Sequence, residues 1–299
     1  MKASRVLAAI LCVAFFATLT GLTAAAAKPK VGLAISTLNN PFFVDLRDGA
    51  LEAAGKVGVE VNVADAQNDP NKQLSQVENF IQERVDIILI NPCDSAAIVP
   101  AIKSANAAKI PVITVDRGSD GGEVVCHIAS DNVEGGRMAG EYLAKLLNYK
   151  GKVVELEGIP GTSAARDRGK GFNEVIKKYP GIQVVARQEA GFDRAKGMTV
   201  MENILQAQPA IDGLFCHNDE MALGALRAIE AAGRLSAIKI VGFDATDDAV
   251  KAVKDGKMAA TVAQKPRTMG AMAVETAKKV LDGASVDKFI PVPLELVTK

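Results

Sequence analysis

The sequence predicts an α/β fold of two Rossmann-like lobes, each a doubly wound parallel sheet, joined by short hinge crossings. Short apolar runs rich in β-branched residues alternate with longer helical patterns from Lys30 onward. Such runs are typical of parallel strands that helices cover on both faces. The second half of the chain repeats the pattern of the first. No segment rich in Pro, Gly and Ser separates the halves, which predicts that the crossings between them are short.

The first half begins with a strand followed by a well-marked helix start. Asn40 is a favoured N-cap residue, and Pro41 suits the first helical position because its missing N–H would be unpaired there. Phe43, Leu46 and Ala50 then recur at helical spacing. The strands expected in this half are residues 31–35, 60–64, 87–91, 112–116 and 124–129. Helices are expected near residues 41–57, 70–83 and 94–108.

The second half supplies five more strands and a final helix that belongs to neither repeat. Its expected strands are residues 153–157, 183–189, 213–217, 239–243 and 260–263. Its helices are expected near residues 163–179, 194–206, 220–233 and 249–256. A further helical pattern, residues 266–281, follows the last strand. Because the first half is short of a covering helix, we expect this one to cross back to it.

The N-terminal segment predicts export from the cell. Lys2 and Arg5 precede an uncharged stretch, residues 6–27, that ends in four alanines. A basic start, an apolar middle and a small-residue end indicate a secretory signal peptide, cut near Ala26 or Ala27. An uncleaved membrane anchor is the alternative, but the Thr-, Gly- and Ala-rich end of the stretch argues against it.

Charge and cysteine content exclude several classes of protein. The chain has 35 Lys and Arg against 35 Asp and Glu, and removal of Lys2 and Arg5 leaves 33 against 35, a formal charge of −2. That balance gives no support for nucleic-acid binding. Three cysteines remain after cleavage: Cys93, Cys126 and Cys216. An odd, small number excludes a disulfide scaffold, and we expect three free, largely buried thiols.

Aromatic rings and an amide follow the first strand, at the edge where open α/β sheets bind ligands. Residues 36–43 read STLNNPFF and place Phe42 and Phe43 side by side in a chain with only 4% aromatic residues. A flat apolar ring beside the Asn40 amide suits a ligand with an apolar face and a polar edge, such as a sugar ring. The alternative is that both rings belong to the core and Asn40 only caps a helix.

Four charged residues follow other expected strands. Asp116 and Arg117 end the fourth strand, while Arg168 and Asp244 come from the second half. If the four line one cleft, their formal charges sum to zero, which favours a neutral ligand over a phosphate, a carboxylate or an amine. Carboxylates and guanidinium groups can each form two hydrogen bonds, so the set suits a neutral polyol. Each residue alone is a weak signal, because Asp and Asn at strand ends also form caps and turns.

The segments that carry these residues resemble a known family over nearly the whole chain after Lys30. They read STLNNPFF, INPCDS, PVITVDR, HIASDN, GIPGTSAARDRG, FDR, HNDEMALGALRA, VGFDAT and ATVAQ, in consistent order and spacing. They are similar to the bacterial periplasmic ribose-binding proteins, type I periplasmic binding proteins that serve as soluble receptors of ABC sugar importers. The departures are mild: Cys93 and Cys126 stand where small polar residues are ordinary, and Cys216–His217 stands where Ala-Gln is expected.

The resemblance implies a monomeric periplasmic receptor that captures a neutral monosaccharide, D-ribose, between two closing lobes. It also implies delivery to an ABC permease in the inner membrane, contact with a chemoreceptor, and no cofactor, metal or catalytic residue. Other small polyols, such as a furanosyl autoinducer, allose or another pentose, are the alternative ligands. The implied hydroxyl-binding residues are Asn40, Asp116, Arg117, Arg168, Asn218, Asp244 and Gln264, and the implied ring-binding residues are Phe42, Phe43, Phe192 and Phe243.

The resemblance also implies how the chain divides. Residues 1–27 form the signal peptide, residues 28–130 with 265–292 form the N-terminal lobe, and residues 131–264 with 293–299 form the C-terminal lobe. Three crossings, near Ser130, Gln264 and Val292, connect the lobes.

Two other classes of protein are less consistent with the sequence. A sugar-responsive repressor of this fold needs a helix-turn-helix headpiece, where this chain has an export signal. An enzyme could use Asp116 and Asp244 as an acid/base pair on a glycoside. However, we expect each to lie near an arginine, which lowers a carboxyl pKa and suits a hydrogen-bond acceptor better than a proton donor. The two histidines, His127 and His217, lack metal-ligand spacing, and the chain has no phosphate-binding loop or nucleophile elbow.

Overall fold

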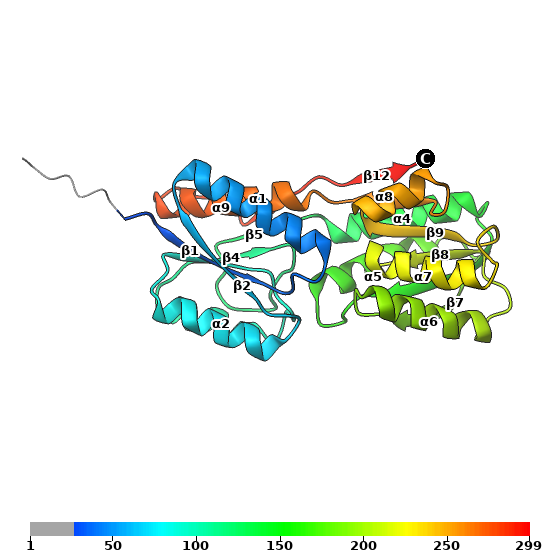
Figure 1. The fold of residues 1–299 in the computed structure, drawn as a ribbon, viewed down its shortest axis with the longest axis horizontal. Coiled ribbons are helices and arrows are strands. Elements are labelled where there is room, and N and C mark those ends of the chain that lie inside the picture. The colour runs from blue at the N-terminus through cyan, green and yellow to red at the C-terminus, as the bar shows by residue number, and fades with distance from the viewer. Residues whose placement is uncertain (1–26) are drawn as a thin grey trace, which may run out of the picture.

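Two lobes make up the molecule, and each is built on one six-stranded sheet (Figure 1). The computed structural model describes residues 27–299, so the predicted signal peptide and its cleavage near Ala26 lie at or outside the edge of the described residues. The expected α/β fold of two doubly wound lobes is confirmed. Among residues 27–299, no helix has the length and apolar character needed to cross a membrane.

The first sheet has the strand order β11-β5-β4-β3-β1-β2, and all its paired strands are parallel. Its strands are β1 (Lys30–Ile35), β2 (Glu60–Asp65), β3 (Ile87–Ile90), β4 (Val112–Val115), β5 (Cys126–Ala129) and β11 (Phe289–Pro291). The helices of this lobe are α1 (Pro41–Val57), α2 (Pro70–Gln82), α3 (Val99–Ala107) and α9 (Pro266–Leu281). Strands β3 and β4 are wholly buried, as expected of central parallel strands.

The second sheet has the order β12-β10-β9-β8-β6-β7, and only β12 runs antiparallel to its neighbour. Its strands are β6 (Gly151–Glu157), β7 (Ile182–Glu189), β8 (Gly213–Cys216), β9 (Lys239–Asp244), β10 (Ala260–Ala263) and β12 (Glu295–Thr298). Its helices are α4 (Asn132–Leu146), α5 (Ser163–Ile176), α6 (Arg194–Ala207), α7 (Asp219–Ala231) and α8 (Asp247–Lys254).

Three expectations about the elements were incomplete. Each sheet has six strands instead of five, because the C-terminal segment adds β11 to the first sheet and β12 to the second. Helix α4 was not expected. The helix expected from residue 94 begins only at Val99, since Asp94 instead accepts the N–H groups of Ala96 and Ala97 and forms a turn.

The last helix returns to the first lobe, as expected. Helix α9 packs along α1 and, in Figure 1, lies beside it although the two are far apart in sequence. A Cβ on Gly49 of α1 would lie 2.0 Å from the Arg267 carbonyl oxygen, and one on Gly270 would lie 1.9 Å from that of Leu46. Glycine at both positions therefore lets the two helix backbones touch.

The chain passes from one sheet to the other three times. The crossings lie between β5 and α4, between β10 and α9, and between β11 and β12. In Figure 1 the red C-terminal segment runs from the first lobe to β12 on the second. We propose that these crossings bound the lobes, at the positions given above, and that they serve as hinges.

Candidate functional site

A cavity lies between the two lobes, at the carboxyl ends of the parallel strands. About 240 Å³ of space unfilled by protein atoms lies among its lining residues, part of it continuous with solvent. Ten of the eleven residues proposed from the sequence line it, and Phe243 is the exception. The lining residues are Asn40, Phe42, Phe43, Asp116, Arg117, Ala164, Arg168, Phe192, Asn218, Asp244 and Gln264.

The turn from β1 into α1 presents the first aromatic wall. Asn40 caps α1, because its Oδ1 accepts the N–H of Phe42 at 2.9 Å. Phe42 and Phe43 meet edge to face with their ring centres 5.2 Å apart. Both rings belong to the buried core of the first lobe and also line the cavity. The core interpretation and the binding interpretation of this turn are therefore compatible.

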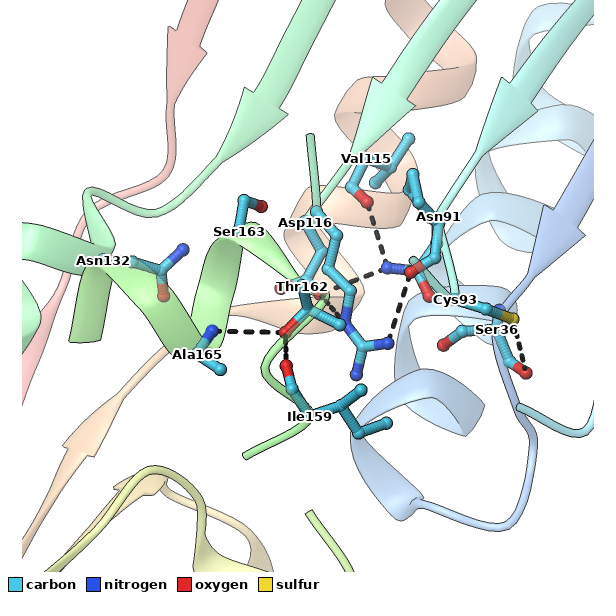
Figure 2. A network of polar contacts seen from close by, with 12 residues as sticks. Ser36, Asn91, Cys93, Val115, Asp116, Asn132, Ile159, Thr162, Ser163 and Ala165 are labelled. Atoms are coloured by element: carbon cyan, nitrogen blue, oxygen red, sulfur yellow. Dashed lines mark hydrogen bonds and ion pairs between the residues drawn. The ribbon is translucent and has the colours of Figure 1, made fainter. Parts of the chain in front are cut away.

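Asp116 and Arg117 enter the cavity from a strained turn after β4. Asp116 has φ of +63°, a conformation that L-residues rarely adopt. Asn91 holds this turn: its Nδ2 donates to the Val115 carbonyl at 3.1 Å and to Asp116 Oδ2 at 3.2 Å (Figure 2). Asp116 Oδ1 and Arg117 Nε are buried and have no hydrogen-bond partner among residues 27–299. Both atoms are therefore available to a ligand.

Arg168 is the corresponding cation of the second lobe. It lies on α5, where its Nε donates to Asn132 Oδ1 at 2.8 Å and its Nη1 to the His217 carbonyl at 2.6 Å. Its Nη1 is also 3.7 Å from Asp244 Oδ1. Glycine makes this geometry possible, since a Cβ on Gly136 of α4 would lie 2.2 Å from the Arg168 carbonyl oxygen.

Phe243 does not line the cavity, contrary to the expectation that it holds a ring face. It is fully buried, and the Arg168 guanidinium carbon lies 3.9 Å from its ring centre. This is a close cation–π contact. The strand places the ring beneath Arg168 instead of beside it, so Phe243 acts on the cavity through Arg168.

Amide side chains complete the second lobe's contribution. Asn218 caps α7 by accepting the Met221 N–H at 3.0 Å. Gln264 Nε2 donates to Asp244 Oδ1 at 2.9 Å, while Gln264 Oε1 is buried without a partner among the described residues. Like Asp116, Asp244 has a positive φ, +118°. The end of β9 is thus strained where it presents this carboxylate.

Arg117 connects the lobes through two aromatic rings. Its guanidinium carbon lies 5.0 Å from the ring centre of Phe43 and 5.2 Å from that of Phe192. Phe43 belongs to the first lobe and Phe192, with φ of +60°, to the second. This stack closes one side of the cavity.

Burial, and not the neighbouring arginines, decides the pKa of both cavity carboxylates. Burial raises the pKa of Asp116 above its ordinary value, although Arg117 and Arg168 act in the opposite direction. Burial also raises the pKa of Asp244, to about 7, against the opposing effects of Arg168 and Gln264. The expectation of lowered carboxyl pKa values was therefore wrong. It underestimated how completely the closed lobes exclude water.

The lobes also bond to each other directly beside the cavity. The Ser95 N–H donates to the Gly161 carbonyl at 2.9 Å, the Ser163 N–H to Ser95 Oγ at 3.1 Å, and the Gly118 N–H to Ser163 Oγ at 2.9 Å. We call these three bonds the interlobe contact. Figure 2 shows Ser163 and Thr162 close to the turn that carries Asp116. Sequence reasoning did not identify this contact.

Four residues outside the proposed ligand-binding set also shape the cavity. Ala164 lines it directly, and Asn91, Asn132 and the His217 carbonyl hold its charged groups in place. Asn91 and Asn132 each follow a strand, which was the available signal. No comparable signal exists for an alanine.

The cysteines and His127 have structural roles. Cys93, Cys126 and Cys216 are free and buried, as expected. Burial raises the pKa of the Cys93 thiol to about 12. His127 lies in β5, where Thr114 Oγ1 is 2.9 Å from its Nδ1. Among the described residues, no group of three His, Cys, Asp or Glu side chains is placed to hold a metal ion.

Comparison with known proteins gives the same picture as the geometry. A family model described as a periplasmic binding protein domain matches residues 31–285. The ribose import binding protein of Escherichia coli is 54% identical over 275 residues, which cover 92% of each chain. That of Bacillus subtilis is 51% identical over 269 residues, which cover 90% of this chain and 87% of the relative.

A solved structure agrees in fold. An ABC transporter solute binding protein from Bacillus halodurans, with bound myo-inositol, superposes with a TM-score of 0.88 at 37% identity. The superposition covers 92% of this chain and 96% of that one. Two doubly wound lobes around a central cavity, together with a family match over most of the sequence, establish that this chain belongs to the periplasmic binding protein family.

Proposed function

We propose that this chain is the periplasmic receptor of an ABC importer and that it captures a neutral monosaccharide, D-ribose, between its lobes. The observation that carries this proposal is the closed cavity between the lobes, where buried polar atoms of Asp116, Arg117 and Gln264 lack partners among the described residues. A ligand rich in hydroxyl groups can pair all three, because each hydroxyl both donates and accepts. Relatives that are 51% and 54% identical are named ribose import binding proteins, which supports ribose as the sugar.

The proposed contacts come from both lobes. Asn40, Asp116 and Arg117 bind hydroxyls from the first lobe. Arg168, Asn218, Asp244 and Gln264 bind them from the second lobe and the crossing after β10. Phe42, Phe43 and Phe192 hold the faces of the ring, and Phe243 supports Arg168 from below. Two carboxylates and two guanidinium groups balance in formal charge, so the cavity suits a neutral ligand.

Capture follows from this division of contacts. Neither lobe alone satisfies the hydroxyls of a sugar, so the ligand binds the closed form far more tightly than an open one. That differential affinity shifts the population toward the closed form. Closure fixes the position of the two lobe surfaces relative to each other. A permease in the inner membrane, and a chemoreceptor, can recognise that arrangement.

We propose that the receptor is a monomer whose signal peptide is removed near Ala26 or Ala27.

A binding role is preferred to an enzymatic one. A carboxyl pKa near 7, as at Asp244, is compatible with proton transfer, so the pKa values do not exclude an enzyme. The preference for a receptor comes from the relatives, which are named as import binding proteins. Incubation with ribosides, followed by analysis for released sugar, tests the alternative; release at a catalytic rate would contradict a receptor.

Titration calorimetry against ribose, allose, arabinose and myo-inositol tests the proposed function. We expect ribose to bind most tightly. Asp116→Ala should weaken ribose binding roughly 10- to 150-fold, because a lost hydrogen bond to a charged group costs about 1.5–3 kcal/mol. Asp282→Ala, an exposed carboxylate at the end of α9, is the matched control and should leave the affinity unchanged. Wild-type protein that binds none of the four would refute the proposal.

A further inference from the structure

We propose that His217 is a positioning residue of the sugar site and that its imidazole bridges Glu155 and Gly158 to hold two walls of the cavity. This inference rests on the proposed function. His217 does not line the cavity, and it stands at a position where the sequence resemblance led us to expect glutamine. This departure from the family pattern immediately precedes Asn218, which lines the cavity.

The ring of His217 is buried and held at both nitrogens. Gly158 N–H donates to Nδ1 at 3.3 Å, and Nε2 lies 3.0 Å from Glu155 Oε1. Because Nδ1 accepts a hydrogen bond, the neutral ring carries its proton on Nε2 and donates it to the carboxylate. The side chain is 1% exposed, so water cannot replace either partner.

Other hydrogen bonds hold Glu155, the acceptor of the His217 ring, in place. Glu155 is fully buried on β6 and accepts hydrogen bonds from Asn173 Nδ2 at 3.0 Å and from Arg187 Nε at 2.7 Å. Burial alone would raise the pKa of Glu155, but hydrogen bonds from His217, Arg187 and Asn173 bring it below its ordinary value. The carboxylate therefore stays charged and remains the hydrogen-bond acceptor for Nε2.

The first wall that His217 holds is Arg168. The His217 carbonyl accepts Arg168 Nη1 at 2.6 Å, a short bond to a charged donor. The backbone at this residue is fixed on one side by the His217 N–H, which donates to the Leu156 carbonyl at 3.0 Å, and on the other by the imidazole bridge. A change of the side chain that tilts this backbone moves the acceptor of Arg168.

The second wall is the ring of Phe192. A Cβ on Gly158 would lie 2.0 Å from Phe192 Cζ, so the ring rests directly on the Gly158 backbone. The bond from Gly158 N–H to His217 Nδ1 fixes that backbone. Phe192 in turn stacks on Arg117 of the other lobe, with 5.2 Å between ring centre and guanidinium carbon. His217 is thereby linked to the stack that closes the cavity.

The two contacts of the imidazole decide which side chain can replace it. Nδ1 accepts and Nε2 donates, so a replacement needs one acceptor and one donor. The charged groups around the ring are Glu155 and Glu157 of β6, Arg187 of β7 and Arg168 of α5. A glutamine at this position offers an amide that can donate to Glu155 and accept the Gly158 N–H.

Two substitutions separate positioning from mere packing. His217→Phe keeps the ring volume next to Phe215 but removes both polar contacts, and we expect the Kd for ribose to rise about tenfold. His217→Gln restores a donor and an acceptor, and we expect its Kd within about threefold of the wild type. The control is Ile238→Ala, a buried residue immediately before β9, which should lower the Tm without changing the Kd.

Rescue by the glutamine provides the second measurement, since a merely structural change at this position would not restore the Kd. A His217→Phe protein that is folded and binds ribose like the wild type, or a His217→Gln protein that binds it as weakly as His217→Phe, would overturn the inference. Wild-type protein that binds no ribose would instead refute the proposed function, and the same variants can then be compared with whichever panel sugar binds.

Discussion

Removal of the Ser163 hydroxyl tests how far the lobes hold each other without help from a ligand. Ser163 Oγ accepts the Gly118 N–H at 2.9 Å, and this bond joins the second lobe to the first. In an open form the two groups separate and each can bond to water. Ser163→Ala therefore destabilises the closed form relative to the open form and leaves each lobe intact. Alanine is also a good residue for the first turn of α5.

The loss of binding free energy in Ser163→Ala follows from how exposed this hydrogen bond is. A hydrogen bond between neutral groups contributes about 0.5–1.5 kcal/mol, and the partly exposed Ser163 belongs in the lower half of that range because water can reach the vacated Gly118 N–H. A loss of about 0.5–1 kcal/mol raises the Kd roughly two- to fivefold. Arg166→Ala, which removes the exposed ion pair with Asp120, should have a smaller and salt-dependent effect.

Calorimetry with ribose, combined with solution scattering, measures the change. We expect Ser163→Ala to weaken binding and to require more sugar for the decrease in radius of gyration that accompanies closure. Ser75→Ala is the control, since that hydroxyl bonds only to the Asn71 carbonyl within α2. A Ser163→Ala protein with the Kd of the wild type would show that the interlobe contact does not bias closure. Identical scattering of wild-type protein with and without bound sugar would refute the hinge mechanism itself.

Three further predictions follow from the buried groups of the lobes. Burial raises the pKa of Asp244 to about 7, so its contribution to stability is present at low pH and lost as the pH rises through about 7. Asp244→Asn should therefore raise the Tm of sugar-free protein at pH 8, with a gain that shrinks toward pH 4, while it weakens ribose binding. Phe43→Ala should weaken binding through loss of ring contact, whereas Phe289→Ala, at an exposed ring, should not. Thiol labelling of denatured, unreduced mature protein should count three thiols, and a count of one would reveal a disulfide.

The fold could be predicted because most of its elements carry a clear period, and the exceptions have physical reasons. Helix α4 buries Gly135, Gly136 and Gly140, residues that weaken a helical pattern. Close packing requires at least one of them, since Gly136 lies against the Arg168 backbone. Strands β11 and β12 were missed because each is short and lies at a sheet edge with little buried surface. Each strand pairs with a strand that is distant from it in the sequence, so no local pattern marks it.

The candidate site could be predicted because parallel strands end at one edge of each sheet. That rule places Asp116 at the carboxyl edge of the first sheet and Asp244 at that of the second, without any knowledge of side-chain direction. It cannot say whether a residue beside the edge points into the cavity or beneath it, and Phe243 turned out to lie beneath Arg168. The carboxyl pKa values were wrong for a related reason. Burial at the cavity depends on how both lobes meet, which no local pattern contains.

The balance between open and closed forms is likewise a property of the whole molecule. Closure without a ligand buries Asp116 Oδ1, Arg117 Nε and Gln264 Oε1 with no partner among the described residues. Leaving such an atom unpaired costs about 1–3 kcal/mol, whereas each bond of the interlobe contact contributes only about 0.5–1.5 kcal/mol. At the middle of these ranges, three unpaired atoms cost about 6 kcal/mol and three bonds contribute about 3 kcal/mol, so the contact offsets about half of that cost. A sugar that pairs these atoms removes the remaining cost, so the same atoms that oppose closure in its absence supply the affinity in its presence.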